Sequence, residues 1–133
     1  MPDLTLEYAQ QIVARGHAAA ATIGMKAVFA VLDKGANLVT FSRMDGAWLA
    51  SNDLAIAKAR TAVMFQAPTE ALNPPLKVGE PVLHFDHIHT GGLLLVGGGL
   101  PLFDTDGALI GGLGVSGGSP DEDAALARAA TAA

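Results

Sequence analysis

Hydrophobic and polar residues follow two different periods along this chain, and the longer period predicts three helices. Thr5 is placed to cap the first helix and Gly24 to end it, with apolar residues between them at Leu6, Ala9, Val13, Ala20 and Ile23. A second helix is predicted from a Ser51 cap to about Phe65, because alanines give this segment a high helix propensity. Residues 119–122 form a capping box with proline at the first helical position, which predicts a third helix to the C-terminus.

Five shorter apolar segments predict strands at 28–32, 38–41, 93–96, 100–103 and 109–115. Turn residues at 33–37 join the first two strands into a hairpin, and those at 104–107 join the last two. The chain thus shows a weak internal repeat: a hairpin with its turn, then a glycine and a capped helix, occur around 33–51 and again around 104–119. The stretch 66–80 has three prolines and no periodicity, so it is predicted to be a loop. The short connections exclude repeated parallel crossovers, so we expect an α/β (α+β) fold with helices packed on an antiparallel sheet.

Composition narrows the class of protein. The chain has 133 residues, of which 50% are hydrophobic and 16% charged, so we expect one compact domain over 1–133. It has no cysteine, which excludes dithiol chemistry, thiolate metal sites and iron–sulfur clusters. The net charge of −5, with scattered basic residues, argues against nucleic acid as a partner. No secretory leader or membrane-spanning run is evident, so we interpret the protein as cytoplasmic and not membrane-bound. Low charge and abundant glycine favour a homo-oligomer.

The glycine-rich stretch 112–118 matches two well-known motifs that the context excludes. A dinucleotide site needs an acidic residue on a further strand about 20 residues on, and the chain ends first, so we expect no nicotinamide or flavin cofactor. A hydrolase elbow needs a histidine after its serine, and all four histidines precede Ser116. Two interpretations stay open for Gly114, Ser116, Gly117 and Gly118. Their backbone N–H groups bind a ligand carboxylate or phosphate, or the glycines only allow a tight turn and close packing.

Five segments together carry a family resemblance: V-L-D-K-G-A-N-L-V at 31–39, R-M-D-G-A at 43–47, A-I-A-K-A-R-T-A at 55–62, G-G-G-L-P-L at 97–102 and I-G-G-L-G-V-S-G-G at 110–118. In this order they resemble the GlcG/HbpS-like haem-binding family and the related accessory domain of some cobalamin adenosyltransferases. The resemblance implies a profilin-like fold, with a five-stranded antiparallel sheet flanked by helices. It also implies homo-oligomers and, for several members, haem or a related ligand as cofactor.

One segment departs from that family pattern. Three of the four histidines, His84, His87 and His89, lie within six residues, together with Asp86. If the segment is extended, His87 and His89 project to one side, where two imidazoles could hold a divalent metal ion or a substrate. The nearby carboxylate of Asp86 could fix a tautomer or complete a ligand set. The alternative is a polar edge or loop with exposed histidines.

Outside this cluster, His17 and Arg43 are the candidate site residues. His17 lies on the apolar face of the first helix, so it is either a core histidine with a satisfied ring or an axial haem ligand. Arg43 either pairs with Asp45 at a turn or clamps a ligand carboxylate with its planar guanidinium. Lys58 is interpreted most simply as a solvated helix residue.

Three functional hypotheses follow. The first is an oligomeric small-molecule-binding domain that holds haem through His17 or a clustered histidine. The second is an isomerase, hydratase or lyase of small-molecule catabolism, in which His84, Asp86, His87, His89 and Arg43 act on a small carboxylate or carbonyl compound. The third is a scaffold without a ligand. We expect the loop at 66–80 to cover a cavity bordered by the histidine cluster, the turn at 114–118 and Arg43.

Overall fold

The computed structural model describes residues 3–72 and 92–132 as one layered α+β unit. Its elements in chain order are α1 (Leu6–Thr22), β1 (Val28–Asp33), β2 (Leu38–Arg43), α2 (Ala50–Phe65), the short 3₁₀ helix η1 (Thr69–Leu72), β3 (Gly99–Phe103), β4 (Leu109–Ser116) and α3 (Pro120–Thr131). In this part of the chain, no helix is both long and apolar enough to cross a membrane.

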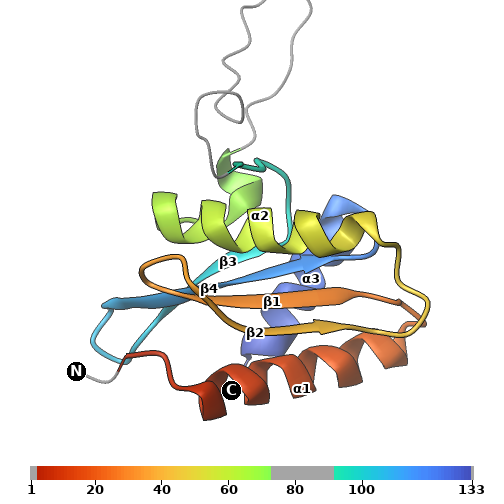
Figure 1. Cartoon of the computed structure of the whole chain (residues 1–133), viewed down its shortest axis with the longest axis horizontal. Helices are drawn as coiled ribbons and strands as arrows, with labels where there is room; N and C mark the ends of the chain where they lie inside the picture. Colours follow the sequence, from red (N-terminus) through yellow and green to blue (C-terminus); the bar gives the residue numbers. More distant parts are fainter. Residues whose placement is uncertain (1–2, 73–91, 133) are drawn as a thin grey trace, which may run out of the picture.

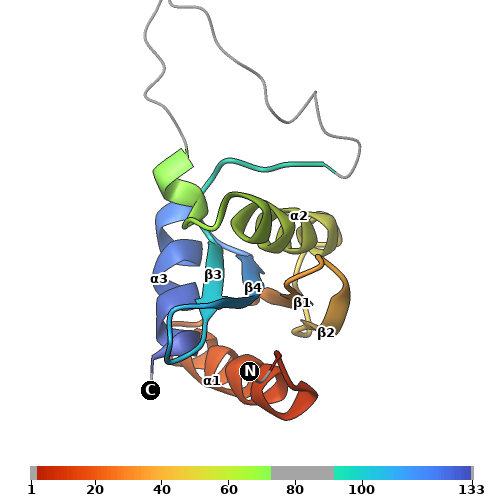
Figure 2. The same ribbon diagram turned by 90° about the vertical axis from the view of Figure 1, so that its left-hand side faces the viewer.

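A four-stranded antiparallel sheet forms the middle layer, in the order β2-β1-β4-β3. Helix α2 covers one face of the sheet, and α1 and α3 lie side by side on the other (Figures 1 and 2). The predicted α+β architecture with an antiparallel sheet is therefore confirmed. The expected fifth strand is not among the described residues. Among the described strands, β2 lies at one edge of the sheet and β3, which contains Pro101, at the other.

The segment predicted as a strand at 93–96 is not a strand in the structure, so that prediction is wrong. Its backbone groups bond to hydroxyl side chains instead. Leu94 N–H donates to Thr61 Oγ1 of α2 at 2.8 Å, and Thr69 Oγ1 of η1 donates to the Val96 carbonyl at 2.6 Å. The buried hydroxyl of Thr69 also accepts the N–H of Gly99, at the start of β3. The apolar pattern of this segment therefore reflects packing beside α2.

Two of the three predicted helix starts are confirmed. Thr5 accepts a hydrogen bond from Tyr8 N–H, and Ser119 forms the complete capping box with Glu122. The predicted cap at Ser51 is wrong, because a preceding turn already starts α2. Ser51 is buried inside the helix, and its own N–H donates to the carbonyl of Trp48.

The two hairpins share one turn design. Asp33 Oδ1 accepts the N–H groups of Gly35 and Asn37, and Asp104 Oδ1 accepts those two and four residues further on in the same way. Each aspartate also exchanges backbone hydrogen bonds across its turn. The repetition seen in the sequence is thus a repeated hairpin, although the helices that follow lie on opposite faces of the sheet (Figure 2).

Glycines on β4 set the distance between α2 and the sheet. A Cβ on Gly114 would overlap the carbonyl oxygen of Ala55, and one on Gly112 would lie 2.8 Å from the carbonyl oxygen of Ala59. The opposite face of the same strand carries large apolar residues, which pack with Phe29 and Ile12 in the main core. Close helix packing therefore explains two glycines of the 112–118 motif.

A buried ion pair closes the end of the sheet where β4 meets α3. Lys58 of α2 is only 3% exposed, so its interpretation as a solvated residue is wrong. Its ammonium donates to Asp123 Oδ2 of α3 at 2.7 Å and to the Val115 carbonyl at 3.0 Å. The other carboxylate oxygen of Asp123 accepts the N–H of Gly118 at 2.9 Å. Burial raises the pKa of Asp123 above its ordinary value, although Lys58 and the backbone N–H groups act to lower it.

This pair predicts an unequal response to single and double substitution. Lys58→Met or Asp123→Asn alone leaves one buried charge unpaired, at an expected cost of about 3–5 kcal/mol of folding free energy. The double variant removes both charges and keeps an amide oxygen able to accept from Gly118, so it should cost well below the sum of the single changes. Urea unfolding of the four proteins measures this, and additive costs would contradict it.

The same carboxyl predicts a pH dependence in the Lys58→Met variant. Without Lys58, the influences that lower the pKa of Asp123 are reduced and burial dominates. The folded state then binds the proton more tightly than the unfolded chain, so the stability of the variant falls as pH rises from about 4 through the raised pKa. Unfolding midpoints across this range should fall in Lys58→Met relative to the double variant. Parallel pH profiles of the two proteins would be the contrary result.

Candidate functional site

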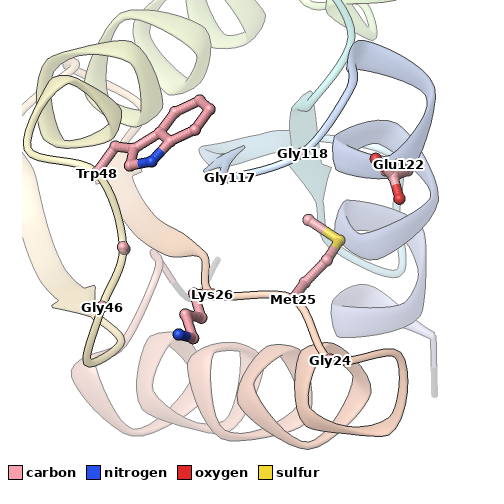
Figure 3. Close-up of a pocket in the computed structure, with 9 residues that line it drawn as sticks. Gly24, Met25, Lys26, Gly46, Trp48, Gly117, Gly118 and Glu122 are labelled. Atoms are coloured by element: carbon pink, nitrogen blue, oxygen red, sulfur yellow. The ribbon is translucent and has the colours of Figure 1, made fainter.

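Two cavities lie on either side of the chain segment between β2 and α2. The first, which we call the turn cavity, has a volume of about 270 Å³. Three connections meet there: the one after α1, the one between β2 and α2, and the one between β4 and α3 (Figure 3). Its lining residues are Gly24, Met25, Lys26, Gly46, Ala47, Trp48, Gly117, Gly118 and Glu122.

Of the four glycine-motif residues predicted to bind a ligand, two reach the turn cavity. Gly117 and Gly118 line it, whereas Gly114 and Ser116 are buried within β4, where they pair with Ala30 and Val28 of β1. The N–H of Gly118 is already donated to Asp123, and that of Ser119 is donated to Glu122 Oε1 at 2.9 Å. These two backbone donors at the turn therefore serve the fold, and a ligand anion would need side-chain donors instead.

The second cavity, which we call the histidine cavity, is lined by His17, Arg43, Met44 and Asp45 and has a volume of about 360 Å³. The half-buried ring of His17 lies against Phe29, with ring centroids 5.3 Å apart and planes tilted by 40°. Its Nε2 is 2.7 Å from the hydroxyl oxygen of Ser42 on β2, a hydrogen-bond distance. The imidazole is thus held by one aromatic contact and one hydroxyl at the wall of an open cavity.

Arg43 is exposed at the end of β2, beside His17 and not beside the glycine turn. The expected single cavity shared by Arg43 and the turn is therefore not found, because the chain leaves one cavity at Asp45 and enters the other at Gly46. Within the described residues no ion pair joins Arg43 to Asp45. Arg43 thus lines the cavity without the acidic partner that the simplest interpretation gave it.

The histidine cluster of His84, Asp86, His87 and His89 lies outside the described residues, as does most of the loop at 66–80. The catalytic and metal-binding hypotheses for these residues stay predictions. Over the ranges 3–72 and 92–132, no group of three histidine, aspartate or glutamate side chains could hold a metal ion.

Sequence reasoning missed the side chains that line the turn cavity. Lys26, Met25 and Trp48 come from connections that carry no motif, and the cavity they form depends on how three separate loops meet. One feature pointed there: the only tryptophan of the chain, Trp48, follows a glycine-containing turn after β2. In the structure the Trp48 side chain is 78% exposed.

Comparison with known proteins identifies relatives over nearly the whole chain. The family model described as "Haem degrading protein HbpS-like" matches residues 4–132. The chain is 32% identical over 127 residues to a 15.0 kDa protein of the dhaT-dhaS intergenic region of Citrobacter freundii, covering 96% of this chain and 89% of that one. It is 40% identical over 99 residues to the corrinoid adenosyltransferase PduO of Salmonella typhimurium, covering 74% of this chain but 29% of the enzyme.

Solved structures show the same arrangement. The crystal structure of the PduOC:haem complex superimposes with a TM-score of 0.88 at 31% identity, covering 97% of this chain and 93% of the other. The sequence comparison and the structural comparison thus identify the same group of relatives. The chain belongs to the HbpS-like family, as its five sequence segments indicated.

Proposed function

We propose that this chain is an oligomeric haem-binding domain, with the iron held by His17 in the histidine cavity. The observation that carries the proposal is that His17, with its half-buried imidazole, and Arg43 line one open cavity, and that Arg43 has no ion pair among the described residues. A neutral imidazole is a common axial ligand of haem iron, and a planar guanidinium suits the carboxylates at the edge of the porphyrin. The haem complex of the related PduOC supports the ligand class.

The surroundings of His17 fit an iron porphyrin. Phe29 fixes the plane of the imidazole, and a Cβ on Gly16 would overlap the Phe29 ring, so α1 and β1 are in close contact at this point. Met44 adds an apolar, polarisable side chain to the wall. Bound haem would supply a redox-active iron centre, while His17 would orient it and Arg43 would hold its carboxylate edge.

The open shape of the histidine cavity supports the oligomeric part of this proposal. A porphyrin on His17 would extend beyond a cavity of about 360 Å³, so part of its apolar surface would stay in water. The adjacent edge strand β2 exposes Leu38 and Phe41, by 55% and 37%. A second copy of this chain placed against β2 would cover both the haem and these side chains.

The proposal predicts that His17 is required for haem binding. Titration of the purified protein with hemin should give a shifted Soret band at one haem per chain. The His17→Gly variant should lose this shift, and free imidazole should restore it by filling the space of the missing ring. An unshifted band with the unmodified protein, or an unchanged shift in His17→Gly, would refute the assignment.

Arg43→Gln serves as a second readout of the same titration, with Arg128→Gln as its matched control. Arg128 pairs with Glu70 at 2.8 Å, outside the residues that line either cavity. Loss of the Arg43 contact should weaken haem binding about two- to fivefold, the usual effect of an exposed ion pair. The control substitution should leave the affinity unchanged.

The contact between Ser42 and His17 predicts competition with iron. Nε2 is the less hindered ring nitrogen and is held at 2.7 Å from the Ser42 hydroxyl, so iron coordination there must break this hydrogen bond. Ser42→Ala should therefore tighten haem binding about two- to tenfold, the range of one net hydrogen bond. Thr22→Ala removes a hydroxyl bonded to the Ala18 carbonyl and is the control. Weaker binding in Ser42→Ala would show instead that the hydroxyl orients the ring for coordination.

A further inference from the structure

The turn cavity has the size and walls of a separate small-molecule site. Its volume of about 270 Å³ is below the range of drug-sized ligand pockets, about 300–1,000 Å³, so it suits a small metabolite rather than a porphyrin. None of its nine lining residues is among those of the histidine cavity. A ligand there would therefore be independent of haem at His17.

Lys26 supplies the positive charge of this cavity. No ion pair engages its ammonium within the described part of the chain. Its side chain lies along the loop at Gly46, where a Cβ would come within 2.9 Å of Cδ and 3.1 Å of Nζ. Gly46, at φ +83°, thus leaves room for the lysine stem beside the cavity. The result is an exposed cation with its hydrogen-bonding capacity available for an anion.

Apolar surface faces the same space. Figure 3 shows the indole of Trp48 and the side chain of Met25 on opposite sides of the cavity, with Gly117 between them. The indole offers a flat face and one N–H donor, and the thioether makes favourable contacts with aromatic rings. A ligand with a flat, apolar body would shield both side chains from water.

Glu122 limits which anion fits. Its carboxylate lines the cavity on α3, on the far side from Lys26 in Figure 3, and one oxygen is committed to Ser119 N–H. A second negative charge on the ligand would therefore face this carboxylate. Because the N–H groups of Gly118 and Ser119 are also taken, a single anionic group beside Lys26 is the arrangement that the charges favour.

We propose that the turn cavity binds a small monocarboxylate with a flat, unsaturated body. The carboxylate pairs with the ammonium of Lys26, and the body lies between the indole of Trp48 and the thioether of Met25. This site goes beyond the proposed haem site and does not require it.

Trp48 is the only tryptophan of the chain, so its fluorescence reports directly on this cavity. Benzoate is the probe, and benzamide is the uncharged molecule of the same shape. In the absence of haem, benzoate should change the tryptophan emission with saturation, and benzamide should bind about two- to fivefold more weakly because it lacks the charge. Emission that does not saturate with benzoate, or equal binding of the two molecules, would overturn the proposal.

Two lysine variants complete the test. Lys26→Met should weaken benzoate binding by about fivefold, whereas Lys34→Met should leave it unchanged. Lys34 is also exposed but pairs with Asp3 at 3.0 Å and is not a lining residue. Equal affinity in Lys26→Met and the unmodified protein would overturn the assignment. His17→Gly should bind benzoate normally, so failure of the haem proposal is distinguishable from failure of this one.

Discussion

The buried ion pair between Lys58 and Asp123 holds together the three layers of this domain. It links α2 on one face of the sheet to α3 on the other, and Lys58 also donates to the Val115 carbonyl near the end of β4 between them. Because the same carboxylate accepts the N–H of Gly118, the conformation of the glycine turn depends on it. The wall of the turn cavity is therefore fixed by a charge pair that does not itself line the cavity. A buried pair of this kind adds little net stability, but it strongly disfavours arrangements that separate the charges.

The elements that the sequence predicted well are those whose information is local. The cap at Thr5, the capping box at Ser119 and the turns at Asp33 and Asp104 each depend on residues within four positions of one another. Such contacts form whatever the rest of the chain does, so pattern and propensity are enough to find them. Family membership was also predictable, because five short segments in this order resemble the family pattern.

The errors came from contacts between distant parts of the chain. The strand expected at 93–96 fails because hydroxyls of Thr61 and Thr69, about 30 residues earlier, take its backbone groups. Lys58 was expected in water because nothing near it in sequence shows the carboxylate 65 positions later. His17 and Arg43 were candidates from the sequence alone, and the structure places both at one cavity. Their separation from the glycine turn depends on how three loops meet, which no local pattern records.

The two edges of the sheet differ in how easily further strands could be added. An exposed edge normally invites another strand, and proline on an edge strand blocks such pairing because it has no N–H to donate. β3 carries Pro101, whereas β2 has no proline along its length. Growth of the sheet is therefore directional: it is hindered at β3 and open at β2. As far as the described strands define the edges, a second copy that pairs its own β2 with this one would use the permissive edge of both chains.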